Sequence, residues 1–255
     1  MTGAEYAEWA AVAERFGVAL EQVRRDHLIS HVLGALAAGV PTDDLVFFGG
    51  TALSRTHLVD ARLSEDIDLV ALAPRSRVAE GIDKAVRRGL ARTHGQPTWR
   101  PALTSARGAE PSLLEVGDTL AVRVQLLTDG GFLWPTEVRQ VEQRYSDAPP
   151  ARLRTLTAAG FAAAKLSAWM DRRAPRDLYD LWALARRGLV DAAALEVFLA
   201  AGPTGKPPGA WVFDVPFDES LWRRALGHQT RLGVTAAEAI AVVRAAWDSV
   251  ARGQC

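Results

Sequence analysis

Apolar positions in the first forty residues recur at helical spacing. Val23, Leu28 and Val32 are an example. Residues at this spacing lie on one face of a helix. Further on, LVFFGG (45–50) is an apolar run that ends in glycine, which is typical of a short buried strand. The pattern predicts helices over 3–16 and 19–38, a strand over 45–50, a helix over 51–59, a strand over 66–72 and a helix over 76–93.

The pattern changes twice beyond residue 95. Between 96 and 145, β-branched and polar residues alternate, as in TLAVRVQLL, which predicts a few antiparallel strands. From Leu156 onward the pattern predicts helices over 157–172, 175–187, 191–201, 218–231 and 235–252. We therefore predict an α+β fold, with a mixed sheet flanked by helices in residues 1–150 and a helical domain in residues 151–255.

Composition narrows the class of protein. The chain has 255 residues, 49% of them hydrophobic, enough for one large domain or two small ones. No run of about 18 uncharged apolar residues is present, so we expect no membrane span. The first residues, MTGAEYAEWAAVAERFG, are typical of a helix and not of a signal peptide, so we expect a cytoplasmic protein. The net charge of zero gives no overall attraction to nucleic acid.

Cysteine and histidine offer little metal chemistry at the level of sequence. The single cysteine, Cys255, excludes an internal disulfide and a cysteine-based zinc site. His27 and His31 lie four residues apart, but no carboxylate stands between them as in a metalloprotease helix. We therefore predict that this pair is simply one face of a helix.

Asp66 and Asp68 are the first candidates for catalysis. Side chains two apart on a strand point the same way, so these carboxylates are predicted to share a face with Ser64 and Arg62. Two like charges on a half-buried strand repel each other and lose hydration unless a cation or a proton intervenes. Oxygen ligands with no histidine nearby favour Mg²⁺, or the similar Mn²⁺, over Zn²⁺.

The Gly49-Gly50 pair precedes these aspartates by the length of one helix. Glycine at a strand-to-helix turn lets the backbone approach a ligand, and helix N-terminal amides, here near Thr51, bind phosphate. Either feature alone is equally well explained by a tight turn or by an exposed strand face. Together and in this order they predict phosphoryl or nucleotidyl transfer.

A second group of candidates lies in the helical part of the chain. Lys165 is one of only three lysines and lies in an apolar, alanine-rich segment, which favours contact with an anion over extension into solvent. Asp177 and Asp180 are three apart and share a helix face. Since Pro175 is expected to begin the helix, Asp177 is explained by the helix dipole, and Asp180 is the stronger catalytic candidate.

Two segments carry a family resemblance. The residues GGTAL (49–53) and RLSEDIDL (62–69), with the later Lys165 and RDLYDLW (176–182), resemble the signature of the AbiEii/AbiGii toxins, which include the MenT toxins of mycobacteria. The resemblance covers residues 47–182 and implies a nucleotidyltransferase fold. It implies transfer of a nucleoside monophosphate from an NTP, with Mg²⁺, to the 3′ end of tRNA. It also implies a winged-helix antitoxin of the AbiEi kind as partner.

The resemblance assigns roles residue by residue. It implies that Asp66 and Asp68 hold metal and, with Lys165 and Asp180, are catalytic. It implies that a further set of residues contacts the nucleotide: Gly49, Gly50, Thr51, Arg62, Ser64, Arg176 and Asp177.

One departure from the fold's usual pattern leaves alternatives open. A third acid is expected on a neighbouring strand, where AVRVQLL has Arg123 and Gln125 instead. Either Asp180, Glu115 or Asp118 fills the role, or the site binds one metal tightly and a second weakly. An inactive nucleotide-binding module is a further alternative. A small molecule or a protein is the alternative acceptor. Arginines that are candidates for binding an RNA acceptor are Arg139, Arg144, Arg152, Arg154, Arg172, Arg173 and Arg176.

Overall fold

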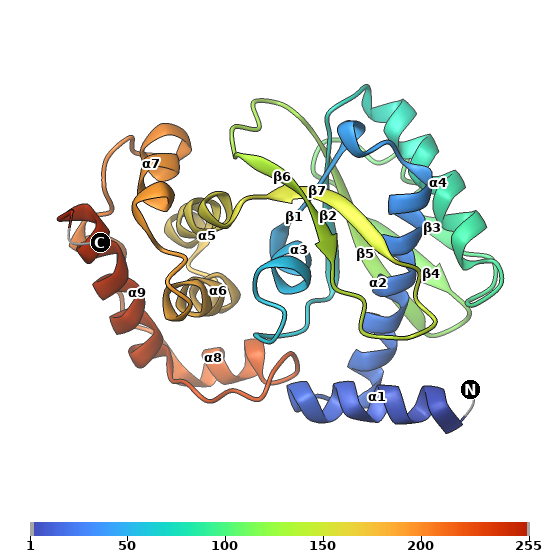
Figure 1. Cartoon of the computed structure of the whole chain (residues 1–255), viewed down its shortest axis with the longest axis horizontal. Coiled ribbons are helices and arrows are strands. Elements are labelled where there is room, and N and C mark those ends of the chain that lie inside the picture. Colours follow the sequence, from blue (N-terminus) through green and yellow to red (C-terminus); the bar gives the residue numbers. More distant parts are fainter. Residues whose placement is uncertain (1–2, 254–255) are drawn as a thin grey trace. The chain divides into compact units, whose positions relative to one another are not determined.

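The computed structural model describes residues 3–253 and divides into two compact units (Figure 1). Unit 1 extends to Phe132 and resumes over Glu137–Thr155. Unit 2 contains Leu133–Thr136 and the chain from Leu156 onward. Cys255 lies outside the described residues, and whether the boundary near residue 150 separates independent domains stays a prediction.

Unit 1 is built on a five-stranded mixed sheet with the strand order β1-β2-β5-β4-β3. β2 and β5 run parallel, and the other neighbouring strands run antiparallel. The strands are β1 (Leu45–Phe48), β2 (Asp66–Ala71), β3 (Thr98–Arg100), β4 (Ser112–Val116) and β5 (Leu120–Thr128). Strands β3, β4 and β5 pair antiparallel with one another, as expected for the region after residue 95. The parallel pairing of β2 with β5 makes the sheet mixed, as predicted. It puts the paired aspartates in the middle of the sheet.

Helices and a ribbon complete this unit. Helix α2 is buried along most of its length and packs against α4 and the sheet. A second sheet of two strands pairs β6 with β7. The helices are α1 (Gly3–Phe16), α2 (Leu20–Gly39), α3 (Gly49–Thr56) and α4 (Arg75–Leu90), and the ribbon is β6 (Thr136–Val141) and β7 (Ala151–Leu156). Strand β7 lies where the sequence pattern predicted only the start of a helical domain.

Unit 2 is helical, as its pattern predicted. Its core holds large aromatic side chains, among them Trp169, Trp222 and Trp247, which are fully buried. The helices are α5 (Ala158–Arg172), α6 (Pro175–Arg186), α7 (Ala192–Ala201), α8 (Glu219–Leu226) and α9 (Ala236–Ala251). Helix α8 ends five residues earlier than predicted, with Gly227 as its C-cap. The α+β class with a helical second part is confirmed.

Within residues 3–253, none of the helices combines the length and the apolar character needed to cross a membrane.

Candidate active site

The two aspartates of β2 lie on one face of the strand. Asp66 and Asp68 are partly exposed, whereas Ile67 and Leu69 are fully buried. This alternation is the two-residue period of a strand with one buried face. The predicted geometry of the carboxylates is therefore confirmed, and their role as metal ligands stays a prediction.

The glycine pair packs against the same strand. Gly49 begins α3 directly after β1, with a φ of +77° that an L side chain rarely adopts. A Cβ added to Gly49 would lie 2.0 Å from Oδ2 of Asp68, and one added to Gly50 would lie 2.8 Å from a guanidinium nitrogen of Arg62. The first turn of α3 thus lies directly against the carboxylate of Asp68, which any side chain at residue 49 would displace.

Three neighbours of the glycines are largely buried. Thr51 donates a hydrogen bond from its hydroxyl to the backbone carbonyl of Asp66, which ties α3 to β2. Arg62 donates to the carbonyl of Leu63 over 3.1 Å. Ser64 has its hydroxyl 3.1 Å from the position a Cβ on Gly50 would take. These contacts hold the glycine turn in place. The Thr51 hydroxyl is bonded to the backbone of β2, so its role in the structure is to position α3.

The neighbouring strand β5 has no acid beside the aspartates. Its register places Arg123 opposite Asp66 and Gln125 opposite Asp68. Arg123 Nε lies 3.9 Å from Asp66 Oδ1, and the Gln125 amide donates to the carbonyl of Ala109. An arginine therefore stands where a third carboxylate was expected, and its charge partly offsets that of Asp66.

The two other candidates for the third acid in unit 1 lie elsewhere on the sheet. Glu115 is opposite Ala121 in the β4–β5 pair and forms an ion pair with Arg100 at 3.2 Å. Asp118 is exposed in the turn between β4 and β5. Neither is opposite an aspartate of β2, so the register brings neither of them beside the pair.

A buried ion cluster that the sequence did not reveal anchors helix α3. Arg55 Nη2 lies 2.8 Å from Asp26 Oδ1, and Arg144 Nη1 lies 2.9 Å from the same oxygen. Tyr145 donates to the other oxygen over 3.0 Å. Burial alone would raise the pKa of Asp26, but the two arginines outweigh it and the pKa lies below its usual value. The cluster stabilises the helix that carries the glycine pair.

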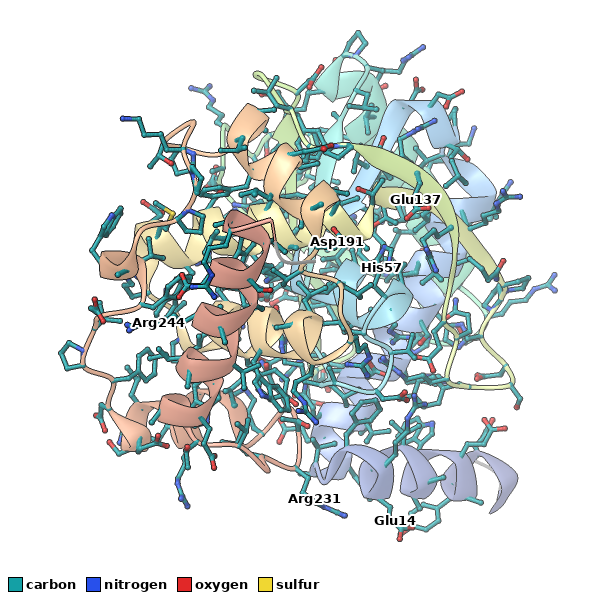
Figure 2. The ribbon with its side chains drawn as sticks, turned by 60° about the vertical axis from the view of Figure 1, so that its left-hand side comes forward. Glu14, His57, Glu137, Asp191, Arg231 and Arg244 are labelled. Atoms are coloured by element: carbon teal, nitrogen blue, oxygen red, sulfur yellow. The ribbon has the colours of Figure 1, made fainter. Side chains whose placement is uncertain are left out.

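The end of α3 has a second contact. His57 is the C-cap of the helix, and its Nε2 lies 3.5 Å from Glu137 Oε1 on β6. Figure 2 shows the two labelled side chains close together. The β6–β7 ribbon therefore contacts the end of the same helix.

Lys165 and the two aspartates of α6 form a buried network in unit 2. Lys165 Nζ lies 3.1 Å from Asp177 Oδ1 and 2.7 Å from Asp180 Oδ2. Arg172 contacts both oxygens of Asp177, at 2.7 and 2.9 Å. Burial would raise the pKa of Asp177, but Lys165 and Arg172 outweigh it and lower that pKa. The anions that Lys165 reaches here are carboxylates, and Asp177 does more than stabilise a helix dipole.

The predicted RNA-binding arginines are largely engaged within the protein. The prediction that Arg144 contacts RNA at the surface is wrong, because its side chain is 1% exposed and lies in the Asp26 cluster. Arg154 pairs with Asp43, and Arg139 with Glu137. The exposed members of the set are Arg152, Arg172 and Arg176. Burial was not visible in the sequence because a charged residue is usually solvated.

Comparison with known proteins identifies the family. Residues 31–252 match the family described as nucleotidyl transferase AbiEii toxin, type IV TA system. The chain belongs to the AbiEii family. It is thus a nucleotidyltransferase toxin of a type IV toxin–antitoxin system, and the resemblance drawn from the glycine and aspartate motifs is confirmed. No curated protein matches.

A solved structure supports the predicted fold. The chain is similar to MenT4, nucleotidyltransferase toxin Rv2826c from Mycobacterium tuberculosis H37Rv, with a TM-score of 0.68 and 23% identity over 94% of this chain and 88% of that one. It also matches an antigenic nucleotidyltransferase-like protein from Paracoccidioides brasiliensis, with a TM-score of 0.39 and 15% identity over 64% and 77% of the two chains. The likeness to MenT4 confirms the predicted nucleotidyltransferase fold.

The AbiEii family implies an NTP substrate and a metal, and the residues of unit 1 fit both. The donor set of Asp66 and Asp68 consists of carboxylate oxygens on one face, the ligands that Mg²⁺ prefers. Gly49 leaves space beside Asp68 Oδ2 that a Cβ would fill. A hard cation and a phosphate therefore have suitable partners at the junction of β2 and α3.

Proposed function

We propose that this AbiEii-family chain transfers a nucleoside monophosphate from an NTP to the 3′ end of tRNA, with Mg²⁺ or Mn²⁺, and so blocks aminoacylation and growth. The observation that carries the proposal is the approach of Gly49 to the carboxylate of Asp68. This approach puts a helix N-terminus that suits phosphate beside carboxylates that suit a metal. Nucleotidyl transfer needs both groups at one place.

The contacts of the residues in unit 1 support the roles that we propose for them. Asp66 and Asp68 would hold the metal, which when bound neutralises phosphate charge and lowers the pKa of the attacking hydroxyl. Backbone amides at Gly49 and Gly50 would bind the triphosphate, because no side chain of the N-cap residue Phe48 caps the start of α3. Arg62 and Ser64 border Gly50 and would contact a phosphate oxygen held there.

The family resemblance supports further proposed roles for residues of unit 2, taken by itself. We assign Lys165 to phosphate binding and Asp180 to an acid role, as the resemblance implies. Asp177 and Asp180 both contact the Lys165 ammonium group and so limit its rotamers. Arg176 is exposed at the start of α6 and would add a further nucleotide contact.

The acceptor and the protein partner rest on the family resemblance. Characterised MenT relatives act on the 3′ end of tRNA, and such toxins are paired with a winged-helix antitoxin of the AbiEi kind. A type IV system implies an antitoxin for this chain. We propose that its antitoxin is of the winged-helix kind.

The deciding experiment measures transfer of label from each α-³²P NTP to purified tRNA in the presence of Mg²⁺. We expect one or more NTPs to label tRNA. We expect the rate to fall about 100-fold or more in Asp68→Asn, because a lost metal ligand costs at least as much as a lost supporting contact. Asp171→Asn is the matched control, since Asp171 is exposed on α5. Equal rates in wild type and Asp68→Asn would refute the assigned site.

A second candidate, an inactive nucleotide-binding module, is favoured by one observation. Arg123 lies opposite Asp66, where its charge offsets the carboxylate without a metal. Metal-dependent NTP binding with no transfer to tRNA, to total protein or to a small hydroxyl compound such as an aminoglycoside would support this candidate. Transfer to protein or to the small compound alone would instead change the acceptor.

A further inference from the structure

Three histidine rings and one carboxylate meet in unit 1, at a place that the proposed transfer reaction does not use. His27 and His31 lie one turn apart on α2. His94 follows α4, and Asp147 lies in the loop between β6 and β7. His27 Nε2 is 3.1 Å from either oxygen of Asp147, and His31 Nε2 is 3.2 Å from Asp147 Oδ2.

These separations suit a shared metal ion. Zinc binds histidine nitrogen and carboxylate oxygen at about 2.0–2.2 Å, so neighbouring ligand atoms of a tetrahedral site lie about 3.3 Å apart. One ligand atom from each of His27, His31 and Asp147 lies within 4.8 Å of the others. A small movement of side chains would therefore give three ligands of one tetrahedron.

His94 and Thr93 provide the contacts that support a metal-bound histidine. His94 Nε2 is 3.2 Å from Nδ1 of His27, and His94 Nδ1 is 2.9 Å from the hydroxyl of Thr93. If Nε2 of His27 binds metal, its Nδ1 carries the proton and donates to His94, which in turn donates to Thr93. Metal-bound histidines generally donate their second N–H to a partner in this way.

Burial favours the neutral form of His31 and His94, and ring contacts hold His27 in place. Burial lowers the pKa of His94 to about 4, and burial together with the nearby His27 lowers the pKa of His31. His27 also packs against Trp9 and Tyr145, with ring centroids 5.2 and 4.8 Å away. Neutral imidazoles in fixed orientations are the form that binds a metal.

The cluster is open to solvent on one side. Asp147 and His94 line a pocket of about 480 Å³, whose wall also carries Glu5, Arg24 and Arg92. Glu8 is close enough to influence both Asp147 and His27 electrostatically. The wall thus carries charges of both signs, and an ion can enter from the pocket.

We propose that His27, His31 and Asp147 bind one divalent transition metal of the zinc class, with water in the fourth position and His94 as a positioning residue. Two imidazoles and one carboxylate suit Zn²⁺, Co²⁺ or Ni²⁺ and do not suit Mg²⁺. The site is separate from Asp66 and Asp68, which offer only carboxylate oxygens as ligands. The proposed metal site does not depend on the proposed nucleotidyl transfer.

A metal here would join elements far apart in the sequence. It would tie the β6–β7 loop, through Asp147, to α2, through His27 and His31. The same loop carries Arg144 and Tyr145 of the cluster that anchors α3. Metal binding therefore stabilises unit 1 and raises the temperature of unfolding in proportion to the logarithm of free metal.

The test uses the full chain, freed of metal by chelation and held in excess Mg²⁺ to occupy the carboxylate site. Zn²⁺ is added in a calorimeter, and Co²⁺ binding is followed by visible absorption, which reports tetrahedral coordination. We expect one ion per chain. We expect Asp147→Asn and His31→Gln to weaken binding about 100-fold, and His94→Gln about tenfold, as lost supporting contacts do.

Two controls distinguish the site from other zinc-binding groups. His228→Gln lies outside the cluster and should bind Zn²⁺ like the wild type. Asp68→Asn should also retain binding, whatever its effect on nucleotidyl transfer. Asp147 is exposed, so its amide variant is expected to fold, and urea unfolding of each variant checks this.

The proposal is overturned if wild type binds no Zn²⁺ at micromolar concentration. In that case Asp147 only accepts hydrogen bonds from the two histidines. It is overturned equally if Asp147→Asn and His31→Gln, both folded, bind as tightly as wild type. A rise in the unfolding temperature with Zn²⁺ in wild type that is absent in Asp147→Asn supports it.

Discussion

Gly49 illustrates how one residue controls the candidate active site. We expect Gly49→Ala to abolish transfer and to lower the free energy of unfolding by about 2–3 kcal/mol, from backbone strain at a φ of +77° and from displacement of Asp68. Gly117→Ala is the matched control, because Gly117 has a φ of +56° and open space around it. It should cost about 1–2 kcal/mol and leave transfer unchanged. Urea unfolding and the labelling assay measure both effects.

The buried carboxyl group of Asp177 makes the free energy of unfolding depend on pH in the acid range. Its pKa is lower in the folded chain, so the unfolded chain takes up the proton first and the stabilisation is present above the unfolded pKa. We expect Asp177→Asn to lower the free energy of unfolding by about 2–3 kcal/mol at pH 7. The difference from wild type should shrink between about pH 5 and pH 3. Urea unfolding at several pH values measures it, and a constant difference would contradict the ion-pair argument.

Helices α2 and α4 pack closely because small residues face each other. A Cβ on Gly89 would lie 2.5 Å from Cβ of Ala35, whereas one on Gly81, in the same helix, meets nothing within 4 Å. We expect Gly89→Ala to destabilise by about 1–3 kcal/mol, since the steric clash exceeds the gain in helix propensity. Gly81→Ala should stabilise by up to about 1 kcal/mol. Thermal unfolding of the two variants compares them, and equal shifts would contradict the packing.

At the scale of the whole molecule, electrostatics limits RNA binding. The net charge is zero, and Arg144 and Arg154 of the expected surface set are paired internally. If tRNA is the acceptor, its affinity should fall with salt, and Arg152→Ala should reduce the slope of log affinity against log salt by about 1. Arg107→Ala, at another exposed arginine, is the control. Filter binding at several salt concentrations measures the slope, and a flat response would count against RNA.

Local periodicity explains why so much of the fold was predictable. Helices α1, α2, α5, α6, α7 and α9 agree with their predicted ranges to within two residues. The shared face of Asp66 and Asp68 follows from the geometry of any strand. Helices α3 and α4 each end three residues before their predicted ends. Helix α8 departs most, because it ends at Leu226 with Gly227 as its C-cap, five residues before its predicted end.

The sequence by itself determined the order of elements, the family and the face on which the paired carboxylates lie, because these depend on backbone geometry and on motifs local in the chain. Only the tertiary structure decided which charged groups meet. Partners such as Arg123 and Asp66, or His27 and Asp147, lie far apart in sequence. Their pairing depends on strand register and on the burial of whole elements, and no local pattern of residues records either.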